Sequence, residues 1–153
     1  MKFFSKLKDS GQNKQLVLFV CVENAGRSQM AEGFFRKYSL EGYEPLSAGT
    51  RPSDINPLAI EAMREVGIDI SKQRPKILTE DMIMKSTLRV NMGCFRQESC
   101  PTLFLHNVID WNIEDPQGKS IEDVRQVRDV IESRVKELVA DISKTKQSFK
   151  IFI

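Results

Sequence analysis

Two residues whose types and spacing suit chemistry on an oxyanion lie near the start of the chain. Cys21 and Arg27 are separated by five residues, and Ser28 follows directly. A loop that leads from a strand into a helix points backbone N–H groups at a bound anion, and an arginine adds a bidentate contact. A cysteine at such a positive site is favoured as the thiolate. The spacing therefore predicts that Cys21 is a nucleophile and that Arg27 stabilises the charge of the reacting group.

The residues around this motif predict the strand, loop and helix that it needs. The apolar run at residues 16–20 is typical of a strand that is buried on both faces. An apolar stripe at helical spacing follows Arg27 and predicts a helix that ends near Tyr38. The competing interpretation of Cys21 is a buried structural cysteine at the end of a strand. The order of strand, loop and helix favours the nucleophile.

Strands and helices alternate along the rest of the chain. We expect further strands at residues 45–48, 87–91 and 108–111, and helices at 57–66, 80–85 and 121–142. Asn56, Thr79 and Ser120 directly precede these three helices and are typical helix caps. The alternation predicts an α/β fold in a single domain, with three layers (α/β/α) and a four-stranded parallel sheet in the middle.

The sequence divides into three parts. Residues 1–14 are a basic N-terminal extension, residues 15–143 are the domain, and residues 144–153 are a C-terminal tail. The extension is either a short amphipathic helix or, more commonly for such a segment, a frayed end. For the tail, an edge strand, a self-association segment and a floppy end all stay open.

The candidate chemical residues follow three different predicted strands. Cys21 ends the first strand, Cys94 comes just after the third, and Asp115 comes just after the fourth. Ligands of parallel α/β folds bind beyond the carboxyl ends of the strands, so we expect these residues to converge there. Asp115, held by the rigid Pro116, is the candidate general acid. The alternative is an ordinary Asp-Pro turn.

Cys94 and Cys100 are candidates for redox chemistry. On a helix, residues six apart are separated by about 9 Å along the axis, whereas a disulfide needs Cα atoms within about 7 Å. A disulfide between them therefore requires a loop, which Gly93 and Pro101 favour. The alternative is a pair of buried small apolar residues, but the polar run at 96–99 argues against burial.

Composition excludes several other classes of function. A net charge of +2, with scattered Lys and Arg, argues against a nucleic-acid partner. No apolar run suits a membrane span or a signal peptide, so we expect a cytoplasmic protein with no membrane partner. Three cysteines suit a reducing compartment better than a disulfide framework. The single histidine, His106, is expected to be a loop residue rather than a catalytic one.

Several spaced segments resemble the low-molecular-weight protein tyrosine phosphatase superfamily and, within it, the thioredoxin-coupled arsenate reductases. The segments are VCVENAGRSQMAEGFF at residues 20–35, SAGT at 47–50, GIDIS at 67–71 and EDP at 114–116. The resemblance runs in order from about Leu16 to about Leu138. It implies the fold predicted above and a reaction at Cys21.

The resemblance implies a role for each cysteine. Cys21 attacks arsenate, Cys94 attacks Cys21 and releases arsenite, and Cys100 forms the disulfide that thioredoxin or a similar dithiol reduces. It implies that Asp115 is the acid, and that Asn24 holds the loop in shape while Ser28 hydrogen-bonds the thiolate. The implied residues that bind arsenate or a phosphate-like oxyanion are Val22, Glu23, Asn24, Ala25, Gly26, Arg27 and Ser28.

The chain departs from its relatives at several places. Gly26 stands where many of them have a further cysteine, and the charge of Glu23 should weaken anion binding unless it points outward. Some members hold potassium with a Glu, a Ser and an Asp. Glu32 and Ser47 match two of these places, but Lys76 stands at the third and would supply the positive charge itself. We therefore predict neither a metal nor a cofactor.

Two alternative functions remain. One is a low-molecular-weight protein tyrosine phosphatase with a cysteinyl-phosphate intermediate. Such phosphatases resemble one another in having an aromatic residue after the Asp-Pro pair, whereas Gln117 and Gly118 follow it here. The other is a non-catalytic module that binds oxyanions or senses redox state, which the combination of Cys21, Arg27 and Asp115 disfavours.

Overall fold

A four-stranded parallel sheet forms the centre of the molecule. The computed structural model describes residues 14–38, 40–93 and 108–151. The strands are β1 (Gln15–Cys21), β2 (Tyr43–Gly49), β3 (Ser86–Asn91) and β4 (Val108–Asp110), in the spatial order β2-β1-β3-β4. All neighbouring pairs are parallel, which confirms the predicted sheet.

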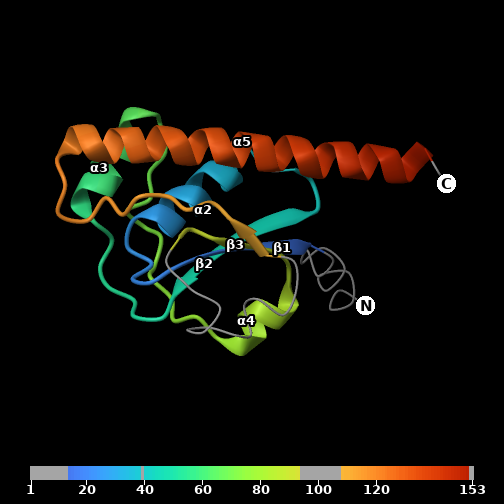
Figure 1. The fold of residues 1–153 in the computed structure, drawn as a ribbon, viewed down its shortest axis with the longest axis horizontal. Helices are drawn as coiled ribbons and strands as arrows, with labels where there is room; N and C mark the ends of the chain where they lie inside the picture. The colour runs from blue at the N-terminus through green and yellow to red at the C-terminus, as the bar shows by residue number, and fades with distance from the viewer. Residues whose placement is uncertain (1–13, 39, 94–107, 152–153) are drawn as a thin grey trace, which may run out of the picture.

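Helices cover both faces of the sheet. On one face lie α2 (Arg27–Tyr38), α3 (Pro57–Glu65) and α5 (Ile121–Ile151), and on the other face lies the short α4 (Glu80–Lys85) (Figure 1). The predicted three-layer architecture is therefore confirmed. Among the described residues, no helix combines the length and the apolar composition needed to cross a membrane.

The side chains of β1 alternate between two apolar cores. Val17 and Phe19 belong to the larger core, whereas Leu18 and Val20 belong to the smaller one. This alternation follows from the period of two in a strand, and it explains why the whole run is apolar. Phe19 lies 5.7 Å from Trp111 between ring centroids, which joins the sheet to the segment after β4.

The three predicted helix caps are confirmed. The Asn56 side chain accepts a hydrogen bond from the Leu58 amide at 3.0 Å, and Thr79 Oγ1 accepts one from the Met82 amide at 3.2 Å. Ser120 Oγ accepts one from the amide of Asp123 at 3.3 Å. Each cap satisfies a backbone donor that the first turn of a helix leaves without a partner in the helix.

The last helix is longer than the sequence predicts. The predicted end near Ile142 is wrong, because α5 continues to Ile151 and extends past the sheet (Figure 1). Residues 144–151 are therefore helical, and the edge strand considered for this segment does not form. Neither Gly nor Pro occurs between Ile121 and Ile151, so the helix meets no stop signal. The boundaries of extension, domain and tail stay predictions, and residues 1–13 lie outside the described residues.

Candidate active site

The loop at residues 22–26 turns its carbonyl groups away from the cavity that it surrounds. Each of the five carbonyl oxygens accepts a hydrogen bond from a donor of the surrounding chain. The pairs are Arg51 N to Val22 O (2.8 Å), Ser53 N to Glu23 O (3.0 Å), Gln29 Nε2 to Asn24 O (3.0 Å), Asn56 N to Ala25 O (2.8 Å) and Met30 N to Gly26 O (2.9 Å). Because C=O and the following N–H point in opposite directions across a planar peptide, the N–H groups face inward.

The segment that supports this loop was not identified in the sequence. Residues 51–56 follow β2 and donate three of the five hydrogen bonds. Gly49 precedes them, and a Cβ there would lie 2.4 Å from the Val22 oxygen and 2.7 Å from the Cys21 oxygen. Only glycine therefore lets β2 approach the loop this closely. SAGT at residues 47–50 was the available signal, since its glycine ends a predicted strand.

Cys21 lies at the base of the loop and is buried, with 3% of its surface exposed. Its Sγ lies 2.7 Å from Ser28 Oγ and accepts the Asn24 amide N–H at 3.2 Å. The Asn24 N–H and the N-terminus of α2 stabilise a negative charge on the sulfur, and the Ser28 hydroxyl is close enough to donate to a thiolate.

The direction of the hydrogen bond from Ser28 follows from a backbone group outside the loop. The N–H of Lys76 can only donate, and it contacts Asn24 Oδ1 at 2.9 Å. The Asn24 Nδ2 group therefore faces Ser28 Oγ, at 2.7 Å, and donates to it. When Cys21 is the thiolate, it has no proton to donate, so the hydroxyl proton of Ser28 is directed at Sγ. Asn24 itself has a φ of 51°, which asparagine tolerates better than most residues.

Arg27 joins the anion loop to the segment that carries Asp115. Its Nη1 donates to the Ile113 carbonyl at 2.8 Å, and its Nη2 lies 3.6 Å from Asp115 Oδ2. The Arg27 side chain is 10% exposed and that of Asp115 is 56% exposed. Asp115 Oδ1 also accepts the Gln117 amide at 3.0 Å, which holds this turn. The acid candidate thus lies beside Arg27 and remains open to solvent.

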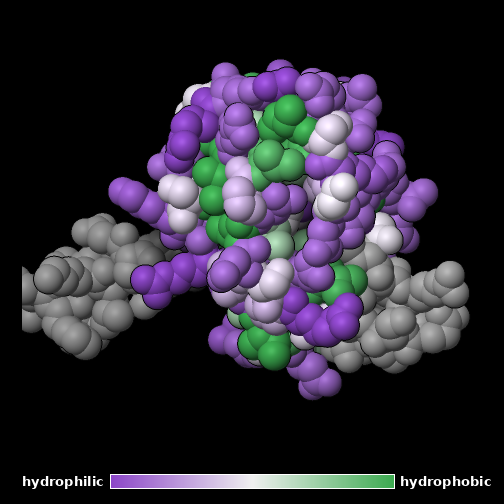
Figure 2. Space-filling view, turned by 90° about the vertical axis from the view of Figure 1, so that its left-hand side faces the viewer, coloured by the Kyte–Doolittle hydropathy of each residue, from purple (hydrophilic) through white to green (hydrophobic). Residues whose placement is uncertain are grey.

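A cavity of about 510 Å³ lies between these segments. Cys21 and Arg27 line it, together with Asp115 and the turn after it. The face at the carboxyl ends of the strands is mostly hydrophilic (Figure 2). Glu23 and Arg51 also line the cavity, so the rim carries charges of both signs. A tetrahedral oxyanion fits a cavity of this size and meets the inward N–H groups.

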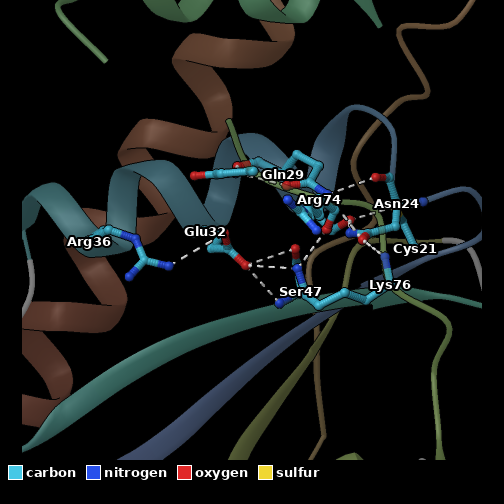
Figure 3. A network of polar contacts seen from close by, with 10 residues as sticks. Cys21, Asn24, Gln29, Glu32, Arg36, Ser47, Arg74 and Lys76 are labelled. Carbon is cyan, nitrogen blue, oxygen red and sulfur yellow. Dashed lines mark hydrogen bonds and ion pairs between the residues drawn. The ribbon is translucent and has the colours of Figure 1, made fainter. Parts of the chain in front are cut away.

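Glu32, Ser47 and Lys76 lie together beside the loop (Figure 3). Glu32 Oε1 accepts the amide and the hydroxyl of Ser47, at 3.1 and 3.0 Å. Lys76 Nζ lies 3.6 Å from the same oxygen, and Arg36 Nη2 lies 3.4 Å from Oε2. The buried Glu32 charge is therefore balanced by two side-chain cations, in agreement with the positive charge expected from Lys76.

Cys94, Cys100 and His106 lie outside the described residues. The chain that leads to Cys94 is described as far as Gly93, and it lies beside the strand of Cys21. Val20 pairs with Asn91, and the Met92 amide donates to the Val20 carbonyl at 3.0 Å. Neighbouring strands lie about 4.8 Å apart. The described chain before Cys94 therefore ends close to the strand that carries the nucleophile.

Comparisons with known proteins agree with this geometry. The model of the low molecular weight phosphotyrosine protein phosphatase family matches residues 16–148. An arsenate reductase of Brevibacillus brevis is 39% identical over 126 residues, which covers 82% of this chain and 94% of that protein. The chain therefore belongs to the low molecular weight phosphotyrosine protein phosphatase family and, within it, to the arsenate reductases.

Similar solved structures include both arsenate reductases and a phosphatase. An arsenate reductase in its phosphate-binding state has a TM-score of 0.74 and 36% identity, and the match covers 84% of this chain and 98% of that one. A thioredoxin-dependent arsenate reductase of Corynebacterium glutamicum has a TM-score of 0.73 and 32% identity, over 94% and 74% of the two chains. An arginine phosphatase from Geobacillus stearothermophilus has a TM-score of 0.79 but 26% identity, over 88% and 96%.

Proposed function

We propose that this chain reduces arsenate to arsenite through a relay of Cys21, Cys94 and Cys100. The observation that carries the proposal is the position of the Cys21 sulfur at the base of an anion-sized loop, where it accepts the Asn24 amide N–H and lies 2.7 Å from the Ser28 hydroxyl. The likeness to arsenate reductases supports the choice of arsenate over other oxyanions of the same shape.

In the first step the Cys21 thiolate attacks arsenic. A sulfur–arsenic bond forms, and one oxygen leaves as water with a proton from Asp115. Arg27 and the inward N–H groups stabilise the negative charge on the remaining oxygens. The exposure of Asp115 supports this assignment, because the acid must take up a new proton before each turnover.

The next step moves an electron pair from sulfur to arsenic, and the step after it moves the disulfide away from Cys21. The Cys94 thiolate attacks Cys21 Sγ, so a disulfide forms and the electron pair of the sulfur–arsenic bond stays with arsenic, which leaves as arsenite. Cys100 then attacks Cys94, which frees Cys21 as a thiolate and leaves a Cys94–Cys100 disulfide. The first of these attacks is supported by Met92, two residues before Cys94, which lies beside β1.

A dithiol must reduce the final disulfide to close the cycle. We assign this role to thioredoxin or a similar protein, because a structurally similar reductase is thioredoxin-dependent. Such a donor and three reactive thiols fit the reducing environment of the cytoplasm, where we place the reaction. The oxyanion site accepts arsenate, and phosphate of the same shape and charge competes for it.

The alternative is phosphatase activity that uses only Cys21, Arg27 and Asp115. The similarity to an arginine phosphatase favours keeping it as a second candidate. Gln117 and Gly118 line the cavity where an aromatic side chain would hold a phenol ring, so a tyrosine phosphatase is the less favoured form.

The test is arsenite production by the pure protein with thioredoxin, thioredoxin reductase and NADPH. Wild type should turn over many times, while Cys94→Ser and Cys100→Ser should not. Hydrolysis of an aryl phosphate serves as the matched control, because it needs neither Cys94 nor Cys100. If no arsenite forms while all three proteins hydrolyse the aryl phosphate equally, the reductase proposal is wrong.

A further inference from the structure

A continuous chain of hydrogen bonds joins Gln73 to the sulfur of Cys21. Its members come from two parts of the chain, residues 21–29 and Gln73, and several are labelled in Figure 3. The successive links are Gln73 Nε2 to Gln29 Oε1 (2.8 Å), Gln29 Nε2 to Asn24 Oδ1 (3.0 Å), Asn24 Nδ2 to Ser28 Oγ (2.7 Å) and Ser28 Oγ to Cys21 Sγ (2.7 Å). The first three links each donate toward the sulfur.

The middle of this chain is fully enclosed. Asn24, Ser28 and Gln29 each have 0% of their surface exposed. If a buried side-chain amide flips by 180°, its oxygen faces a neighbour's oxygen and its hydrogen bonds are lost. Solvent does not reach these buried groups to replace them, so the flip costs free energy. The direction of the chain is therefore held as a unit, from the first donor to the sulfur.

Gln73 supplies the donor that holds Gln29 in its orientation. Its Nε2 contacts two oxygens of Gln29, Oε1 at 2.8 Å and the backbone carbonyl at 3.0 Å. Gln29 in turn uses its own Nε2 for both oxygens of Asn24, the carbonyl and Oδ1, each at 3.0 Å. If the side-chain amide of Gln29 flipped by 180°, its Oε1 would face two oxygens of Asn24.

We propose that Gln73 is a positioning residue for the reaction at Cys21: it fixes the direction of this chain so that Ser28 donates its proton to the sulfur. This role for Gln73 depends on one part of the proposed function, namely that Cys21 is the nucleophile. Gln73 does not line the cavity, so its substitution leaves the walls of the oxyanion site unchanged. The Lys76 amide also holds Asn24, and the effect of Gln73 is therefore partial.

The test measures ionisation of Cys21 as the only thiol. In a Cys94→Ser, Cys100→Ser background, thiolate absorbance near 240 nm is followed against pH. Gln73→Met removes the donor without adding charge and should raise the pH midpoint of ionisation by about half a unit to one unit. Gln73→Lys restores a donor and adds a positive charge, so it should return the midpoint to that of the background protein or lower it further.

The outcomes separate this proposal from the proposed function. If the Gln73→Met protein unfolds at the same temperature as the background and has the same midpoint, Gln73 does not position the chain. An equal shift in Gln73→Lys would also overturn the proposal, because it would mean that any change at this place disturbs the loop. Neither readout involves arsenate, so the reductase activity can fail while this proposal holds.

Discussion

Arg27 takes part in both halves of the site. It begins α2 directly after the anion loop, and its guanidinium contacts the Ile113 carbonyl and lies beside Asp115. A single side chain thus links the anion loop to the segment that carries the acid. A lysine would keep the charge but lose the planar fork that makes two separate contacts, so the geometry of the site depends on arginine itself.

The negative charge of Glu23 disfavours anion binding at the site. This residue is half-buried and lines the cavity, although the loop binds anions. Glu23→Gln should lower the dissociation constant for phosphate about twofold to fivefold at low ionic strength, and less at high salt, because screening weakens the repulsion. Inhibition of aryl phosphate hydrolysis by phosphate measures this constant. Glu80→Gln, an equal charge change on α4, is the control, and equal effects of both would contradict the prediction.

At the scale of elements, the end of β2 shapes the anion loop. Gly49→Ala should lower the free energy of unfolding by more than about 2 kcal/mol, because its Cβ would overlap two carbonyl oxygens of the loop. The matched control is Gly42→Ala, where φ is +88° and no atom lies within 4 Å of the added Cβ. Gly42→Ala should lower the free energy of unfolding by only about 1 kcal/mol. Denaturant unfolding compares them, and equal losses would show that the close approach of β2 is unimportant.

Helices α3 and α5 are joined by charges at their exposed edge. Arg125 and Arg128 both contact the Glu65 carboxylate, at 2.6 and 2.8 Å. The hydrogen bond from Arg125 is the main cause that lowers the pKa of Glu65 below its ordinary value of 4.5. A lowered pKa in the folded state stabilises the protein above the ordinary value, and this stabilisation is lost as the pH falls through the lowered pKa.

The ion pairs of Glu65 should make the stability of the protein depend on pH in the acid range. Glu65→Gln should lower the free energy of unfolding at pH 7, and the difference from wild type should shrink as the pH falls below 4.5 toward the lowered pKa. Urea unfolding from pH 7 down to about pH 3 measures this difference. A difference that stays constant over this range would mean that the ion pair contributes nothing.

At the scale of the whole molecule, local patterns in the sequence predicted most of the fold. The apolar run of β1, the stripe along α2, and the caps at Asn56 and Thr79 are local signals, and each appears in the structure. The end of α5 was missed because no residue there stops a helix. Local patterns therefore located the strand edge at which the site lies.

The supports of the site could not be predicted in the same way. The hydrogen bonds from residues 51–56 to the loop, and the chain from Gln73 to Cys21, join segments that are distant in sequence. No periodicity marks a backbone amide that meets a particular carbonyl across the fold. Cys21 and Arg27 were evident from their spacing, whereas Gln29 and Gln73 are ordinary polar residues until the fold brings them together.

The most direct test of the central claim is a single turnover without thioredoxin. Reduced protein is mixed with arsenate, arsenite is quantified, thiols are counted, and disulfides are mapped by peptide mass spectrometry. We predict one arsenite per protein, a fall from three thiols to one, and a Cys94–Cys100 disulfide, with no arsenite from Cys21→Ser. Three thiols that remain after incubation with arsenate, in a protein that still hydrolyses an aryl phosphate, would contradict it.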